Sequence, residues 1–254
     1  MLKFLGAIML VGVAAYLVAC AALFFAQRSF IYYPPRQAML RPPATMTLEV
    51  PGATLKVSER PLPGRKALIY LGGNAEDVSA SLPLLDGVFP DRALYLLHYR
   101  GYAGSSGAPS EDALVGDALL LFDRVAAAHP DITLVGRSLG SGVALQVASR
   151  RPVGKLVLVT PFNSLQEMAA QQFPYFPVNW LLRDKYESWR YAPQVKAPTL
   201  LLAAQHDEIV PAASTRRLLT HFAPNLATLQ MVPDAGHNTI SATPAYLAAL
   251  AWAR

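Results

Sequence analysis

Short apolar runs alternate with amphipathic stretches along most of this chain, and this alternation constrains the fold more than any other feature. Runs with a near-continuous apolar centre are typical of strands buried on both faces of a parallel sheet. They occupy residues 66–73, 93–101, 131–138, 155–162, 198–207 and 227–237. Helical patterns lie between them, over residues 77–85, 111–128, 139–150, 212–222 and 241–253. Strand and helix in alternation predict an α/β fold with a mostly parallel, doubly wound sheet.

Two segments depart from this rhythm. Residues 47–50 and 55–60 have the pattern of two short strands joined at Pro51-Gly52, ahead of the parallel set. Residues 163–194 are too long for an ordinary connection between neighbouring strands, and they are rich in aromatic residues and proline. We therefore expect a short helical cap inserted at about 163–194.

Residues 4–26 carry no charged side chain. As a helix this run would reach roughly 34 Å, enough to cross a hydrocarbon core of about 30 Å. Tyr32 and Tyr33 then fall where interfacial aromatic residues tend to lie. We expect residues 1–35 to be a single-pass membrane anchor with its juxtamembrane residues, and residues 36–254 to form one globular domain.

Two alternatives to an uncleaved anchor remain at this stage. The sequence LVAC at residues 17–20 resembles the bacterial lipoprotein box, in which Cys20 would carry the lipid, although the apolar run continues past that cysteine. A cleaved secretory signal is the other alternative. The basic residues on the two sides of the run do not decide which side of the membrane holds the domain.

The formal net charge is +5, and the 22 lysine and arginine residues are scattered along the chain. Because no basic run is interleaved with aromatic residues, we expect no nucleic-acid partner. The basic excess fits either an anionic membrane surface or an ordinary arginine-rich protein. Cys20 is the only cysteine, which excludes an intramolecular disulfide and a thiolate metal site.

A serine lies between glycines where one apolar run stops. Gly136-Arg137-Ser138-Leu139-Gly140 matches G-x-S-x-G between a predicted strand and a predicted helix, the context of a nucleophile elbow. Glycines are needed on both sides because a Cβ there would strike the neighbouring strand or helix. A turn that only caps a helix has the same short pattern, so the motif alone does not decide.

Two further residues complete a candidate catalytic triad. A serine hydroxyl becomes a good nucleophile when a base takes its proton, and a carboxylate orients that base. His237 follows the last predicted strand and Asp207 the one before, which gives the order serine, aspartate, histidine found in α/β hydrolases. Glu208 and His206, beside Asp207, are expected to be solvated or structural. Structural roles are also expected for His98, His129 and His221.

From residue 28 to the end, most of the chain resembles the membrane-anchored α/β-hydrolase-domain serine hydrolases of the serine-aminopeptidase-like branch. The matching blocks are LGGNAED, YRGYAGSSGAPSED, TPFNSL, HDEIVP and GHN. The resemblance implies an α/β-hydrolase fold and acyl-group hydrolysis with no metal and no organic cofactor. It also implies substrates such as lipid esters, small esters or thioester-linked palmitate on proteins.

Two positions depart from the family pattern. Gly72 stands where a histidine is usual, and His98 where an aspartate or similar residue often precedes the tyrosine. The expected oxyanion donors are the backbone amides of Asn74 and Leu139, so Gly72 leaves them in place. It leaves open how the loop of residues 72–76 is held.

We therefore expect a membrane-associated serine hydrolase that cleaves acyl ester or thioester bonds, or amides, through Ser138, His237 and Asp207. A non-catalytic, membrane-tethered binding protein and an acyltransferase with the same triad are the alternatives. Arg137 either binds a substrate carboxylate or faces a neighbouring loop. The cap aromatic residues either line an acyl pocket or pack against the domain: Phe173, Tyr175, Phe176 and Trp180.

Overall fold

The computed structural model describes residues 1–35 and 44–254, so part of the proline-rich connector and the first residues of the expected globular domain lie outside it. Within the described residues one sheet has eight strands, in the order β1-β2-β4-β3-β5-β6-β7-β8. The strands are β1 (Ala44–Val50), β2 (Ala53–Arg60), β3 (Lys66–Leu71), β4 (Ala93–Leu97), β5 (Asp131–Arg137), β6 (Lys155–Val159), β7 (Thr199–Ala204) and β8 (Ala227–Val232).

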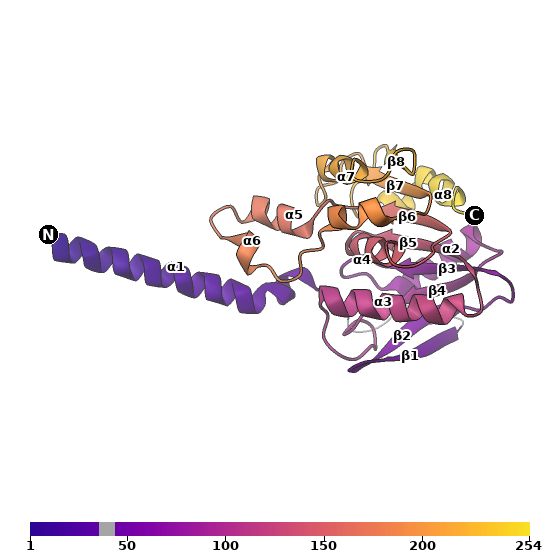
Figure 1. The fold of residues 1–254 in the computed structure, drawn as a ribbon, viewed down its shortest axis with the longest axis horizontal. Helices are drawn as coiled ribbons and strands as arrows, with labels where there is room; N and C mark the ends of the chain where they lie inside the picture. Colours follow the sequence, from indigo (N-terminus) through magenta and orange to yellow (C-terminus); the bar gives the residue numbers. More distant parts are fainter. Residues whose placement is uncertain (36–43) are drawn as a thin grey trace.

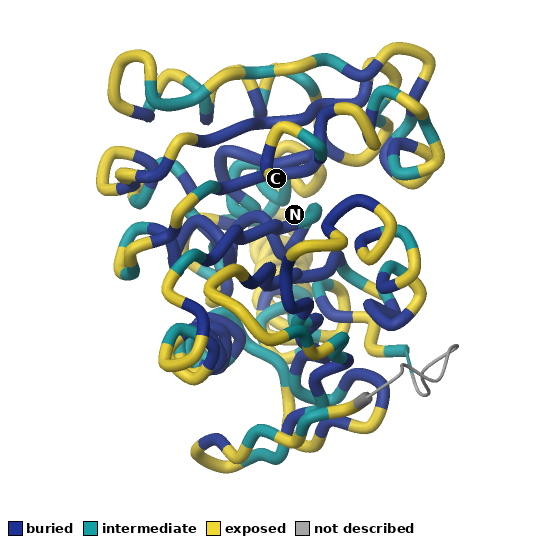
Figure 2. The backbone as a smooth tube through the Cα atoms, turned by 90° about the vertical axis from the view of Figure 1, so that its right-hand side faces the viewer, coloured by how far each residue is buried: buried dark blue, intermediate teal, exposed yellow. Residues whose placement is uncertain are grey.

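The sheet is mostly parallel, as the sequence predicts. The β1–β2 hairpin is antiparallel and turns at Pro51-Gly52, β2 also pairs antiparallel with β4, and every pairing from β4 to β8 is parallel. The predicted strand over 93–101 is too long, because β4 ends at Leu97 and the chain then leaves the sheet. Figure 2 shows the buried backbone gathered along the central strands, with exposed loops around them.

Helices cover both faces of the sheet, which confirms the doubly wound arrangement (Figure 1). One apolar core includes residues of α3 (Glu111–Ala126), α4 (Leu139–Ala148) and α7 (Ala212–Leu219). The other includes residues of α2 (Leu82–Val88) and α8 (Pro244–Ala251). Short 3-10 helices precede the last two, η1 (Val78–Ser81) and η4 (Ile240–Ala242). The single helix predicted over 77–85 is therefore wrong: a 3-10 turn comes first and α2 extends to Val88.

Successive residues of one strand serve opposite cores. Leu68 and Tyr70 of β3 pack in the core beneath α2 and α8, whereas Ile69 and Leu71 pack in the core beneath α3 and α4. This alternation explains why the strand is apolar throughout rather than at every second residue. The helix α3 begins where predicted, since the Ser110 hydroxyl accepts a hydrogen bond from the Ala113 N–H.

The connection between β6 and β7 is helical and stands away from the sheet beside the N-terminal helix (Figure 1). It contains α5 (Leu165–Gln172), α6 (Val178–Leu181), η2 (Ser188–Arg190) and η3 (Ala192–Gln194). The Ser164 hydroxyl caps α5 by accepting from the Glu167 N–H. We refer to residues 163–194 as the cap.

The N-terminal helix α1 (Leu2–Ile31) projects far beyond the rest of the molecule (Figure 1). Among the described residues it is the one helix long and apolar enough to cross a membrane: within Lys3–Ile31, an 18-residue window has a mean hydropathy of 2.5, and 6% of that window is buried. A helix in the core of a domain would be largely buried, so this low burial sets α1 apart from core helices.

The last turns of α1 bind the cap through polar contacts. Arg28 donates from Nε and Nη2 to the two oxygens of Asp184, at 2.9 and 3.2 Å. The Tyr32 hydroxyl lies 3.2 Å from Asp184 and 2.9 Å from the Tyr186 hydroxyl. Gln27 donates to the Leu181 carbonyl at 3.1 Å. Because the Asp184 side chain is only 5% exposed, its charge depends on these partners.

We predict that Asp184→Asn loosens the cap from α1. The asparagine side chain lacks the negative charge that attracts Arg28. Loss of the charge-assisted hydrogen bond costs about 1.5 kcal/mol, which raises the equilibrium constant for local opening roughly tenfold. Trypsin cleaves after Arg183 and Lys185, on either side of this residue, so limited proteolysis reports the opening directly.

The matched control is Asp123→Asn, which removes an ion pair with Arg151 in which the Asp123 side chain is 47% exposed. This variant is expected to be cleaved in the cap at the wild-type rate. Equal cleavage rates for both variants would show that the Asp184 contacts do not hold the cap.

Candidate active site

The carboxyl ends of three parallel strands bring together the serine, the aspartate and the histidine that the sequence singled out. Ser138 directly follows β5, Asp207 follows β7, and His237 follows β8. His237 Nε2 lies 2.9 Å from Ser138 Oγ, and His237 Nδ1 lies 2.9 and 3.0 Å from the two carboxylate oxygens of Asp207. The three side chains therefore form one hydrogen-bonded chain.

A tight turn presents the serine. Ser138 has φ 49° and ψ −117°, a strained left-handed conformation that a non-glycine residue rarely adopts. A Cβ on Gly136 would meet the Ala144 Cβ at 2.6 Å, and a Cβ on Gly140 would strike the carbonyl oxygens of Leu71 and Gly72. Glycine is therefore required on both sides of Ser138, because β3 and α4 approach the turn so closely.

The aspartate is held from its own loop. Asp207 Oδ1 accepts from the backbone N–H groups of Ile209 and Val210, at 2.9 and 2.7 Å. In the Asp207–His237 pair the side chains are 3% and 5% exposed. Because a carboxylate only accepts, Nδ1 of His237 is the donor and Nε2 is left to accept from the Ser138 hydroxyl. This is the tautomer that a general base requires.

The neighbours of Asp207 lie outside that chain. Glu208 accepts from the His237 N–H at 3.2 Å, so it contacts the histidine loop and not the imidazole. His206 is exposed. Both positions agree with the solvated or structural roles expected from the sequence.

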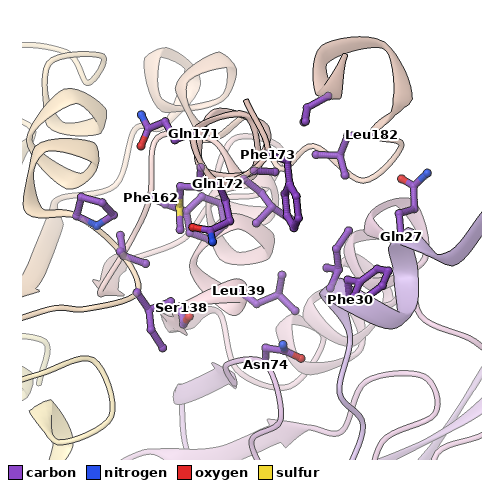
Figure 3. A pocket seen from close by; sticks show the side chains of 18 of the residues that line it. Gln27, Phe30, Asn74, Ser138, Leu139, Phe162, Gln171, Gln172, Phe173 and Leu182 are labelled. Carbon is purple, nitrogen blue, oxygen red and sulfur yellow. The ribbon is translucent and has the colours of Figure 1, made fainter. Parts of the chain in front are cut away.

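The loop of residues 72–76 lies beside the serine, and Figure 3 shows Asn74 and Leu139 next to Ser138. Asn74 Oδ1 accepts from the Tyr33 N–H at 2.9 Å and from the Tyr102 hydroxyl at 3.0 Å. Among the described residues, the backbone N–H groups of Asn74 and Leu139 have no hydrogen-bond acceptor. Neither amide is therefore engaged by the described part of the chain.

A cavity of about 660 Å³ opens in front of Ser138, between α1 and the cap. Figure 3 shows Phe30 of α1 and Phe173 of the cap on opposite sides of it. Its apolar lining comes from three parts of the chain: Leu23, Phe30 and Ile31 of α1; Leu165, Met168, Ala169, Phe173, Phe176, Val178, Leu181 and Leu182 of the cap; and Leu139, Phe162, Ile209, Val210 and Pro211 of the domain.

Of the four cap aromatic residues, two line this cavity and two do not. Phe173 and Phe176 belong to its wall, whereas Tyr175 and Trp180 are 86% and 88% exposed. The sequence led us to expect that the cap aromatic residues either line an acyl pocket or pack against the domain. Neither role describes Tyr175 or Trp180.

Comparison with solved structures identifies the architecture. The chain aligns with the esterase Pf2001 of Pyrococcus furiosus at a TM-score of 0.68 and 17% identity, over 87% of this chain and 95% of the esterase. It aligns with a putative hydrolase of Agrobacterium vitis at a TM-score of 0.66 and 18% identity, over 84% of this chain and 98% of that one. The chain has the α/β-hydrolase fold. At these identities the likeness shows the fold alone.

Among the sequence relatives, one is named as an alpha/beta hydrolase domain protein. Uncharacterized protein Rv2307c of Mycobacterium tuberculosis is 37% identical over 68% of this chain and 63% of its own length. Alpha/beta hydrolase domain-containing protein aho-3 of Caenorhabditis elegans is 30% identical over 74% of this chain and 57% of its own. Lysophosphatidylserine lipase ABHD12 of the mouse is 32% identical over 50% of this chain and 37% of its own. No family model matches the chain.

Within this α/β-hydrolase fold Arg137, the residue beside the serine, faces a neighbouring loop. Its Nη1 donates to Glu76 Oε2 at 3.1 Å, and its Nη2 donates to the His237 carbonyl at 3.3 Å. Burial alone would lower the pKa of Arg137, but the Glu76 carboxylate more than offsets it, so the pKa lies above its ordinary value. The guanidinium stays charged and is not part of the cavity wall.

Glu76 lies at the centre of a cluster of polar groups that is separate from the Asp207–His237–Ser138 chain. Besides Arg137, it accepts from the Gly73 N–H at 2.6 Å, the Tyr70 hydroxyl at 2.7 Å and the Ser81 hydroxyl at 2.9 Å. Burial, reinforced by Glu76, raises the pKa of Tyr70 well above its usual value, so this phenol remains a donor. The carboxylate thus holds the 72–76 loop, in which position 72 is a glycine.

The remaining histidines of the hydrolase fold lie among structural partners. His98 Nε2 is 2.7 Å from the Ser58 hydroxyl of β2, and burial lowers the pKa of His98. His129 Nδ1 lies 2.8 Å from the Gly64 carbonyl, and the His221 ring packs beside Trp189. Among the described residues no cluster of three or more His, Cys, Asp or Glu side chains is placed to hold a metal ion.

We predict that Gly140→Ala destabilises the hydrolase fold by at least about 3 kcal/mol, because the new Cβ would strike two backbone carbonyls that cannot move independently of β3. Gly116→Ala is the control. It lies inside α3 with nothing within 4 Å of an added Cβ, and it should stabilise by about 0.5 to 1 kcal/mol. Urea unfolding followed by circular dichroism in detergent measures both, and a neutral Gly140→Ala would contradict the close approach.

We predict that Arg137 and Glu76 are energetically coupled. Their side chains are 13% and 11% exposed, so Arg137→Met or Glu76→Gln alone should cost about 3 kcal/mol by leaving the other group without its partner. The double variant should lose about 2 kcal/mol less than the sum of the two single losses. Additive losses in a double-mutant cycle would show that the pair is not coupled.

Proposed function

We propose that this chain is a membrane-anchored serine hydrolase that cleaves acyl ester or thioester bonds. The observation that carries the proposal is the hydrogen-bonded chain from Asp207 through His237 to Ser138, opening on a largely apolar cavity. A serine with its base at 2.9 Å and a buried carboxylate behind that base is the arrangement that activates a hydroxyl for attack on a carbonyl.

The reaction follows from these positions. His237 Nε2 takes the Ser138 proton while Oγ attacks the acyl carbonyl, and Asp207 stabilises the imidazolium that forms. The carbonyl oxygen becomes an oxyanion that accepts from the amides of Asn74 and Leu139. His237 then returns the proton to the leaving alcohol or thiol. A water molecule, deprotonated by His237, attacks the resulting acyl-Ser138 ester and releases the acid.

The oxyanion loop is a large part of this scheme. Loss of one such donor typically costs about 3 to 4 kcal/mol of transition-state stabilisation. In this chain the Asn74 amide is placed by the bonds that its own side chain accepts from Tyr33 and Tyr102. Tyr33 follows α1 directly, so the juxtamembrane residues help to place the donor.

The cavity supports an acyl chain as the group recognised. Its lining is mostly aliphatic and aromatic, with a few polar side chains, which suits a hydrocarbon attached to a reactive carbonyl. The relative named as a lysophosphatidylserine lipase supports a lipid ester within this class. The low burial and high hydropathy of α1 support anchoring in the membrane that would hold such a substrate.

We predict that a fluorophosphonate probe labels the wild-type protein and that Ser138→Ala abolishes the labelling, because the probe reacts with an activated serine only. Ser149→Ala is the control: its hydroxyl donates to the Gln146 carbonyl at the far end of α4, and the variant should label normally. Failure of the wild type to label, or equal labelling of Ser138→Ala, would favour the non-catalytic alternative.

We predict that Ala169→Phe shortens the acyl chain that the site accepts. Ala169 lines the cavity and Ala170, the next residue of α5, does not, which makes Ala170→Phe a matched control. For Ala169→Phe, kcat/KM for a palmitoyl ester should fall about tenfold, while that for an acetyl ester stays unchanged. An equal effect of both variants on both esters would contradict the cavity as the acyl site.

A further inference from the structure

The cap carries a second apolar surface beside α1. Residues 168–182 include no charged side chain. Within them Tyr175 and Trp180 are 86% and 88% exposed, and neither lines the cavity. We call residues 173–182 the cap tip. Large aromatic side chains left exposed together indicate a surface that contacts something other than water.

The cap tip has a fixed place along α1. The Tyr16 hydroxyl donates to the Tyr175 carbonyl at 2.9 Å, and the Tyr16 ring stacks on Phe176 at 5.9 Å between centroids. At the other end of the tip, Gln27 binds the Leu181 carbonyl at 3.1 Å. The tip therefore follows α1 for 11 residues of helix, or about 16 Å.

The length of α1 sets where this tip lies if the helix crosses a bilayer. A hydrocarbon core of about 30 Å takes about 20 helical residues. From the charged Lys3 to Tyr16 the helix rises only about 20 Å. Tyr16 is then still about 10 Å inside the core, and the part of the cap tip that contacts it lies at the same depth.

The charged residues that follow the tip mark a boundary consistent with this depth. The Arg183 guanidinium lies over the Phe24 ring, 5.8 Å from its centroid, and Lys185 follows two residues later. About 20 residues counted from Lys3 end at Leu23, next to Phe24. The count along α1 and the first cationic side chain after the tip therefore place the headgroup level at the same turn of the helix.

We propose that the cap tip is immersed in the lipid leaflet beside α1, with Tyr175 and Trp180 in contact with lipid. This inference rests on the proposed anchoring of α1. The inference goes further than the anchoring, because an anchor alone would leave the cap in water. Since Leu23, Phe173 and Phe176 belong to both the cavity wall and this embedded region, the cavity opens toward acyl chains of the leaflet.

The three tryptophans of the chain allow a direct test by quenching with acyl-chain-brominated phosphatidylcholine. One single-tryptophan protein, Trp189→Phe/Trp252→Phe, keeps Trp180; a second, Trp180→Phe/Trp189→Phe, keeps Trp252 near the C-terminus, which is 39% exposed. A third carries Leu10→Trp with all three native tryptophans replaced by phenylalanine, and it reports on α1. The full chain is reconstituted in phosphatidylcholine vesicles with and without the brominated lipid.

Trp180 and the Leu10→Trp reporter should each lose about half of their emission in brominated vesicles, while Trp252 emission stays nearly unchanged. Quenching of the Leu10→Trp reporter without quenching of Trp180 would overturn the immersed cap tip and leave the anchor intact. Absence of quenching at both positions would overturn the anchor and the immersed tip together. Hydrolysis of a soluble acetyl ester, measured on the same samples, tests the active site separately.

A second measurement does not depend on tryptophan. In a Cys20→Ser background, a nitroxide attached at Tyr175→Cys should be relaxed more by oxygen than by a water-soluble nickel chelate. One attached at Leu120→Cys, which is 41% exposed on α3, should show the reverse. Equal nickel accessibility at the two positions would overturn the proposal.

Discussion

The left-handed backbone at Ser138 is the constraint on which the candidate site depends. A strand and a helix meet at this residue with no connecting loop, and the carbonyls of β3 lie against the first turn of α4. Because this turn is rigid, the serine hydroxyl has one direction to point, and the loops after β7 and β8 can be short and still reach it. The strain at Ser138 is stored in the turn and sustained by the two cores on either side of the sheet.

A second constraint joins the membrane-facing part of the chain to the cap. Asp184 is a buried carboxylate whose partners, Arg28 and Tyr32, both come from the N-terminal segment. A buried charge cannot give up its partners without a desolvation cost, so these contacts join the last turns of α1 to the cap beside the cavity. The helix that would hold the protein in the membrane therefore also forms one wall of the space in front of Ser138.

The sequence predicts the sheet, most helices and the order of the three candidate catalytic residues, because each depends on local pattern and on where strands end. It does not predict the partner of Arg137, since Glu76 lies 61 residues away and meets it only when β3 and β5 are neighbours. The contact between Arg28 and Asp184, which are 156 residues apart, cannot be predicted from local sequence pattern either. The break between η1 and α2 was missed because apolar periodicity does not separate a 3-10 turn from an α-helix.

The Glu76 cluster has a consequence for how such a chain can change. One carboxylate holds the 72–76 loop through the Gly73 N–H and reaches the histidine loop through Arg137, so neither loop can be redesigned alone. An apolar residue at position 137 would leave the Glu76 carboxylate without its cationic partner. A neutral residue at position 76 would leave the Arg137 guanidinium without its anionic partner. Substitutions at positions 76 and 137 are therefore expected to occur together during evolution. The G-x-S-x-G pattern alone would allow any residue at position 137.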